Sequence, residues 1–124
     1  MPKLTYFSDT EVAGLEPEVA TKIDQARHLA AIPFIITSTR RTPEQNLAVG
    51  GVSDSAHLKG LAVDLAVPDS HALFLMVKAC LDVGFKRIVI GINVDSDGKV
   101  AYHNLHCDLD GTLPTPVLSI KRYG

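Results

Sequence analysis

The sequence predicts a small α+β domain in which helices pack on one face of a largely antiparallel sheet. Two long segments place apolar residues at the three- and four-residue spacing of an amphipathic helix. Short β-branched runs lie between and after them, and a polar turn over residues 93–98 joins the last two, which indicates a hairpin. A length of 124 residues is typical of one domain, so residues 1–124 are expected to share one core.

Capping residues support three expected helices. Pro17 suits the first turn of the first helix, and Thr42 suits the N-cap of the second. Asp69 or Ser70 caps the third helix, and Gly84 ends it. The helices are expected over residues 16–31, in a short stretch from Pro43, and over residues 70–83.

Four strands are expected, and the second carries an acidic residue. Its apolar run contains Asp64 and stops at Pro68. The Gly- and Ser-rich residues 50–55 form a loop before it. The tail holds Pro114 and Pro116 and is expected to be an irregular surface strap. The strands are expected over residues 34–37, 61–67, 86–92 and 99–109.

Charge and hydropathy exclude several classes of function. The net charge of −2 gives no electrostatic basis for binding nucleic acid or an anionic membrane. No apolar run approaches the roughly 20 residues of a membrane span. The N-terminus lacks the basic start and apolar core of a signal peptide, so synthesis in the cytoplasm is expected. Cys80 and Cys107 are expected to be buried free thiols, and a monomer is favoured.

Asp64 is the residue that first indicates a bound metal. An ionised carboxylate buried in an apolar run is costly without a partner, and a cation is the simplest partner. His57 lies shortly before Asp64 in a glycine-flanked loop, and His106 lies in the last strand. Two imidazoles, one carboxylate and an open position for water suit a catalytic zinc site. Spacing alone leaves open that both histidines are ordinary core or surface residues.

Strand periodicity sorts the polar residues of the last strand. In a regular strand His106 and Asp108 share one face, whereas His103 and Cys107 share the other. If His106 binds the metal, Cys107 therefore points into the core. His103 joins the site only if the strand is bulged or begins after residue 103.

Residues 55–64 read Ser-Ala-His-Leu-Lys-Gly-Leu-Ala-Val-Asp and match a family motif, Ser-x-His-x-x-Gly-x-Ala-x-Asp. The motif is that of the zinc D-alanyl-D-alanine carboxypeptidases. Residues 36–46 resemble that family's Ser-Gly-Tyr-Arg-Thr-Pro-Glu-x-Asn segment, with Arg41 at the family arginine. Residues 102–108 resemble the block that contributes the third ligand. The family includes vancomycin-resistance D,D-dipeptidases and several phage endolysins, and it shares its fold with the hedgehog signalling domain.

The resemblance implies a role for each matching residue. His57, Asp64 and His106 would bind one Zn²⁺ ion. Arg41 would hold a substrate carboxylate or stabilise the oxyanion of the transition state. Ser55 would hydrogen-bond the substrate or His57, or would cap a turn.

The general base is open between two residues. Many family members place Glu or Asp three residues before the last histidine ligand, where this chain has His103. Some carboxypeptidases of the family carry a histidine there too, so His103 is the preferred base. Asp108, on the strand face of His106, is either the base or a group that orients the site.

The implied function is hydrolysis of peptidoglycan stem peptides by metal-activated water. The reaction would be that of a D-Ala-D-Ala carboxypeptidase or of an endolysin-type L-Ala-D-Glu endopeptidase. The missing signal peptide favours a phage or prophage lysis protein that acts on the cell wall. The alternatives are a catalytically silent zinc-binding relative that binds cell wall or protein, and a structural protein whose metal is only a staple.

Overall fold

The computed structural model describes residues 3–53 and 55–123; Met1, Pro2, Gly124 and Asp54, which belongs to the expected loop at 50–55, lie outside the described residues. No helix within the described residues is long and apolar enough to cross a membrane. The elements in chain order are α1 (Pro17–Ala30), β1 (Ile36–Ser38), α2 (Pro43–Ala48), the 3₁₀ helix η1 (Ala56–Lys59), β2 (Ala62–Leu65), α3 (Ser70–Asp82), β3 (Arg87–Val94), β4 (Val100–Asp108) and β5 (Val117–Arg122).

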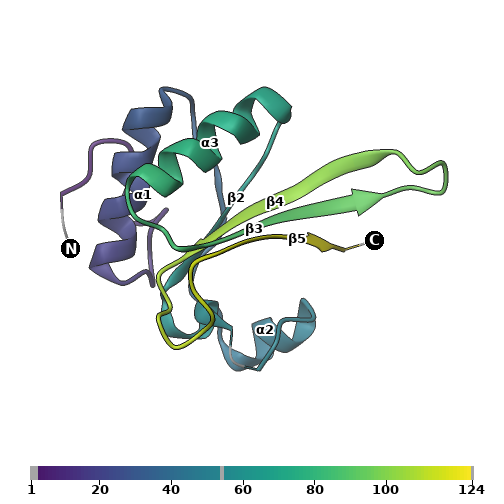
Figure 1. The fold of residues 1–124 in the computed structure, drawn as a ribbon. Helices are drawn as coiled ribbons and strands as arrows, with labels where there is room; N and C mark the ends of the chain where they lie inside the picture. The colour runs from purple at the N-terminus through teal and green to yellow at the C-terminus, as the bar shows by residue number, and fades with distance from the viewer. Residues whose placement is uncertain (1–2, 54, 124) are drawn as a thin grey trace.

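The described strands form one sheet in the order β1-β2-β4-β3-β5. Neighbours pair antiparallel except β5, which runs parallel to β3 (Figure 1). The expected β3–β4 hairpin is present and extends beyond the helices (Figure 1). The predicted α+β class with a largely antiparallel sheet is thus confirmed.

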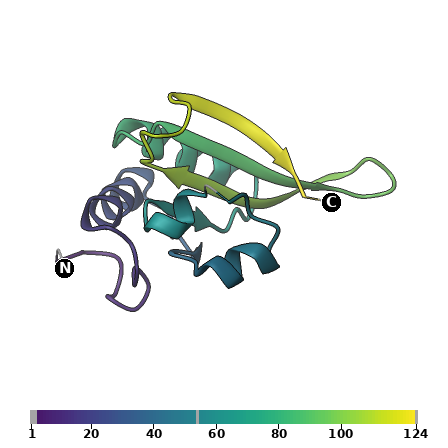
Figure 2. The same ribbon diagram turned by 90° about the horizontal axis from the view of Figure 1, so that it is seen from below.

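Helices α1 and α3 cover one face of the sheet, and the core lies between them and the strands (Figure 1). Val63 of β2 and Leu105 of β4 pack there with Met76 of α3, and all three are fully buried. Cys80 and Cys107 belong to the same core and are free thiols, as expected. Helix α2 and η1 lie on the opposite side of the sheet (Figure 2). Because side chains alternate along a strand, residues next to the core residues point toward α2 and η1.

Side-chain caps begin two of the helices where the sequence predicts them. The Thr42 hydroxyl accepts a hydrogen bond from the backbone N–H of Gln45 at 3.1 Å, and the Gln45 side chain accepts one from the Thr42 N–H at 2.9 Å. This reciprocal capping box fixes the start of α2. Asp69 is the N-cap of α3, since its carboxylate accepts from the N–H of Ala72 at 2.8 Å.

The tail is not an irregular strap, and this expectation was wrong. Its two prolines precede β5 and so remove no donor from the ladder. Val117 directly after them donates its N–H to the carbonyl of Lys86 at 2.7 Å, which starts the parallel pairing with β3. The tail therefore becomes an edge strand that runs beside the hairpin.

Strand β4 is bulged at His103. Asn104 pairs with Gly91 but Tyr102 pairs with Ile92, so His103 is the extra residue on the β4 side. A bulge places two successive side chains against one partner and breaks the alternation of faces. The condition under which His103 can join the face of His106 is therefore met.

Replacing Gly60 with Ala should destabilise the protein by about 1–3 kcal/mol, because Gly60 ends η1 with a positive φ of 71°. A Cβ there would also lie 2.5 Å from the carbonyl oxygen of Gly14. Gly98→Ala is the matched control, since Gly98 has a φ of 80° in open space. Urea unfolding should show the larger loss for Gly60→Ala; equal losses would mean that the contact with Gly14 contributes nothing.

Candidate metal centre

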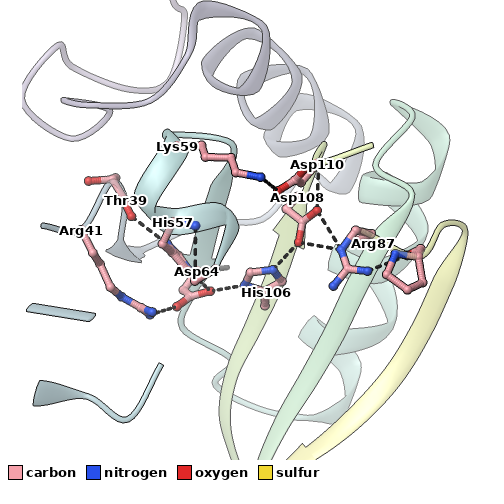
Figure 3. A network of polar contacts seen from close by, with 11 residues as sticks. Thr39, Arg41, His57, Lys59, Asp64, Arg87, His106, Asp108 and Asp110 are labelled. Carbon is pink, nitrogen blue, oxygen red and sulfur yellow. Dashed lines mark hydrogen bonds and ion pairs between the residues drawn. The ribbon is translucent and has the colours of Figure 1, made fainter. Parts of the chain in front are cut away.

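His57, Asp64 and His106 meet on the sheet face that points away from α1 and α3 (Figure 3). Asp64 in β2 is the direct cross-strand partner of His106 in β4. Facing residues of an antiparallel pair lie on the same side with Cβ atoms about 5 Å apart, so strand pairing alone joins these two. His57 comes from η1, and the turn at Gly60 leads the chain back into β2. The predicted ligand set is thereby brought together.

The three side chains converge on one carboxylate oxygen. Asp64 Oδ1 lies 3.1 Å from His57 Nε2 and 3.0 Å from His106 Nδ1. One ligand atom from each residue lies within 4.8 Å of the other two. Ligand atoms of a tetrahedral zinc ion, each about 2 Å from the metal, are about 3.3 Å apart. The spacing of the group therefore suits one ion.

Each histidine uses its other ring nitrogen to contact an oxygen outside the group. His57 Nδ1 lies 2.7 Å from the carbonyl oxygen of Thr39, and His106 Nε2 lies 2.6 Å from Asp108 Oδ2 (Figure 3). A carbonyl oxygen only accepts, so His57 Nδ1 carries a proton, and Nε2 is the ring atom that would bind a metal. Such contacts fix the tautomer and ring orientation of metal-binding histidines. The donor set therefore fits zinc by chemistry as well as by spacing.

The electrostatics of the group are those of a carboxylate held between imidazoles. Burial by itself would raise the pKa of Asp64, but hydrogen bonds from His106 and His57 hold this pKa well below its usual range. Burial lowers the pKa of His106, but its hydrogen bonds to Asp108 and Asp64 outweigh burial and raise the pKa to about 9. In the metal-free protein His106 is therefore protonated near neutral pH, and a metal must displace that proton.

Arg41 lies beside the group on the side of α2. Its Nη2 donates to Asp64 Oδ2 at 3.1 Å (Figure 3). Nε and Nη1 donate to Ser38 Oγ and Asn46 Oδ1, both at 3.3 Å. The two neutral partners hold the guanidinium in place, so that it neutralises the second oxygen of Asp64 while Oδ1 faces the histidines.

Asp108 lies behind His106 and is fully buried. Its carboxylate contacts His106 on one side and Arg87 Nε on the other, at 3.1 Å from Oδ1 (Figure 3). Oδ1 also accepts from the backbone N–H of Asp110 at 3.0 Å. Sequence analysis did not identify Arg87, although the hairpin register, which pairs it with Asp108, was the signal that could have found it.

His103 and Ser55 flank the group without contacting Asp64. His103 is exposed, its Nδ1 lies 3.5 Å from Asn93 Nδ2, and its ring stacks on Tyr123 with centroids 4.0 Å apart. The Ser55 hydroxyl accepts from the backbone N–H of His57 at 3.3 Å and caps η1. Ser55 therefore forms the turn cap that was one of its expected roles.

The cleft above the group consists of two cavities that share lining residues. A cavity of about 160 Å³ is lined by all three metal-group residues together with Ser55 and Asp108. A second cavity of about 460 Å³, here called the His103 lobe, shares with the first the residues Arg41, Asp64, Lys121 and Tyr123 and adds His103 and Asn104. Lys121 belongs to β5 and Tyr123 directly follows it, so the tail that was expected to be a surface strap forms one wall of the cleft.

Two imidazoles and one carboxylate, open to a cleft on a small α+β domain, are the arrangement of a metal-dependent hydrolase. Residues 4–95 match the peptidase M15 family, and the chain belongs to this family of zinc D-Ala-D-Ala carboxypeptidases. A comparison with curated proteins gives no match. The matched span contains His57 and Asp64 but ends before His106. The third member of the group is therefore contributed by β4, through its pairing with β2.

The metal-free protein should lose stability as the pH rises from about 6.5 to about 9. The pKa of His106 is raised above its ordinary value of 6.5, so its contribution is fully present below about 6.5 and lost as the pH passes about 9. Melting of chelator-treated protein should show this loss, which is up to about 3 kcal/mol for a shift of this size. His106→Gln should remove the trend. A melting temperature that is constant over this range would contradict the protonated bridge.

Asp108→Asn should weaken zinc binding by about 10-fold to 100-fold, because the charged acceptor that orients His106 and raises its basicity is lost. Competition with a fluorescent zinc chelator measures this change. Asp110→Asn is the matched control, since the Asp110 carboxylate is buried but bonds Lys59 and Thr112 rather than a histidine. Equal zinc affinity in wild type and Asp108→Asn would refute the orienting role.

Proposed function

We propose that the protein is a zinc peptidase that hydrolyses peptidoglycan stem peptides. The observation that carries this proposal is the convergence of His57, Asp64 and His106 at the floor of a cleft, with one side of the group open. Membership of the peptidase M15 family supports it independently, because the family acts on such peptides. The cell wall is the proposed place of action, and a phage or prophage lysis protein is the proposed setting.

The metal would be held by His57 Nε2, His106 Nδ1 and Asp64. A bound zinc ion would act as a Lewis acid toward the scissile carbonyl and toward water. Thr39 fixes the ring of His57, and Asp108 fixes the ring of His106. The buried core residues of β2 and β4 support the metal group from the other face of the sheet. These contacts hold the group before substrate arrives, which is what electrostatic preorganisation requires.

His103 is the proposed general base. It lines the cleft next to Asp64, and its Nε2 has no hydrogen-bond partner among the described residues. It would take a proton from the attacking water and deliver it to the leaving amine. Asp108 is the weaker candidate, because its carboxylate already bonds His106, Arg87 and a backbone N–H, and it is fully buried. Its proposed role is to orient His106.

Arg41 is the proposed partner for negative charge on the substrate. Its guanidinium lines both cavities of the cleft, so it can donate to the carbonyl oxygen of the scissile bond as charge develops there. In the same position it can donate to a substrate carboxylate. Ser55 lines the same cavity as the metal group, and a hydrogen bond from its hydroxyl to the substrate is proposed as well.

Two peptide bonds of the stem peptide are proposed as candidates for the bond that is cut. A D,D-carboxypeptidase would release the terminal D-alanine of the stem peptide, whereas an endopeptidase would cut between L-alanine and D-glutamate. Both reactions need the same metal group, general base and cation. Product analysis by mass spectrometry distinguishes them, since only the endopeptidase separates the stem peptide from the glycan strand.

Zinc-loaded protein should release soluble products from purified peptidoglycan, and chelator should abolish the release. His103→Ala should lower kcat by about 10²-fold to 10⁴-fold, the usual range for a lost general base, without changing zinc content. His71→Ala is the matched control, because His71 is an exposed histidine of α3. Intact peptidoglycan after treatment with zinc-loaded wild type would overturn the proposed function and favour a silent binding relative. Full activity of His103→Ala would overturn only the base assignment.

A further inference from the structure

Strand β5 and the residue after it place two side chains, Lys121 and Tyr123, in the cleft. Both line the two cavities that meet over Arg41 and Asp64. Lys121 lies in β5, and Tyr123 follows the last residue of that strand, where its backbone N–H bonds the carbonyl of Ile92. Neither belongs to residues 4–95, which match the peptidase family, and the reaction proposed above assigns no role to either.

The ring of Tyr123 has packing contacts on two sides in the His103 lobe. Its backbone N–H donates to the carbonyl of Ile92 at 2.8 Å, so the strand pairing continues to this residue. The ring packs against Gly91, where a Cβ would lie 2.9 Å from Tyr123 Cε2. On another side it stacks on His103, with centroids 4.0 Å apart and an angle of 18° between the planes. Tyr123 therefore connects β5 to the bulge that carries the proposed base.

Lys121 is the cation of the cleft that has no carboxylate partner among the described residues. Its Nζ lies 4.7 Å from the centroid of Tyr123, which is a cation–π contact. Arg41 is paired with Asp64 and Arg87 with Asp108. No ion pair joins Lys121 to an acidic group in residues 3–53 or 55–123.

A second unsatisfied polar group lies in the same lobe. Asn104 is only 7% exposed, yet its Oδ1 has no hydrogen-bond partner. No other contact satisfies this carboxamide within the described residues. This oxygen is covered, packs against Gly91 and only accepts hydrogen bonds, so it is not a partner for a carboxylate in the lobe.

We propose that the His103 lobe binds a carboxylate of the substrate peptide through Lys121, with Tyr123 positioning the ammonium group. This inference rests on the proposed function and extends it to a substrate class, namely peptides with a free carboxylate near the scissile bond. Lys121 supplies a positive charge that no carboxylate of the described residues neutralises, in addition to the donors of Arg41. The ring of Tyr123 contacts the ammonium group of that lysine and stacks on His103, so it places the charge relative to His103.

A carboxylate near the bond has two sources in a stem peptide. It is the terminal carboxylate if the enzyme removes the last D-alanine, and the free carboxylate of D-glutamate if the enzyme cuts after L-alanine. Peptides that carry an amide in place of one or the other carboxylate separate these sources. The identity of the recognised carboxylate then also identifies which bond is presented to the metal group.

Steady-state kinetics of the zinc-loaded protein test the proposal with the pentapeptide L-Ala-D-Glu-L-Lys-D-Ala-D-Ala, its C-terminal amide and its D-isoglutamine form. Lys121→Met should raise KM for the acid about fivefold to tenfold and leave kcat within about twofold, as expected for a lost ion pair at the rim of a site. Lys121→Arg should restore KM. Lys99→Met is the matched control, since Lys99 lies in the hairpin turn outside the cleft.

One of the amides should bind equally to wild type and Lys121→Met, and the amide that does so identifies the carboxylate. An unchanged KM for the acid, or an equal rise for the acid and both amides, would overturn the proposal. If wild type does not hydrolyse the pentapeptide, titration calorimetry of the same peptides against both zinc-loaded proteins applies the same criterion to Kd. The carboxylate site and the proposed peptidase activity can therefore fail separately.

Discussion

The rest of the structure depends on one buried carboxylate. Asp64 is 3% exposed and is held by two imidazoles on one oxygen and a guanidinium on the other. An unpaired carboxylate at this depth would cost several kcal/mol, so these partners are a requirement of the fold as well as of the site. They connect η1, β4 and the segment before α2 to strand β2. The group that could hold a metal is thus also a polar link between these segments.

The two faces of β2 and β4 have different roles: one packs in the core, and the other carries the metal group. One face presents Val63 and Leu105 to α1 and α3, and the other presents Asp64 and His106 to the cleft. The period of two along each strand makes this division automatic once the register is set. A slip of one residue between β2 and β4 would exchange the faces and expose the core residues, so the packing of the core secures the geometry of the site.

The sequence predicted those features that depend on interactions between residues close together in the chain. It predicted the capping residues Thr42 and Asp69 and the turn of the β3–β4 hairpin. It also predicted the family motif and the alternation of faces that separates His106 from Cys107. The bulge at His103 and the pairing of β5 with β3 were not predicted, because each depends on which strand lies alongside. Because the tail contains two prolines, it was expected to be irregular, although both lie in the connection before β5 and not in the strand. Arg87, Lys121 and Tyr123 were missed for the same reason, since their roles follow from sheet order.

The cross-strand pair Asp64 and His106 has a consequence for folding. The two residues are 42 positions apart in the chain, so an ion bound to both closes a long loop of the unfolded polypeptide. Only a chain in which β2 and β4 have already paired presents the two ligands together. Metal loading and completion of the sheet would therefore be thermodynamically linked, and an ion bound there would act as a reversible cross-link between β2 and β4.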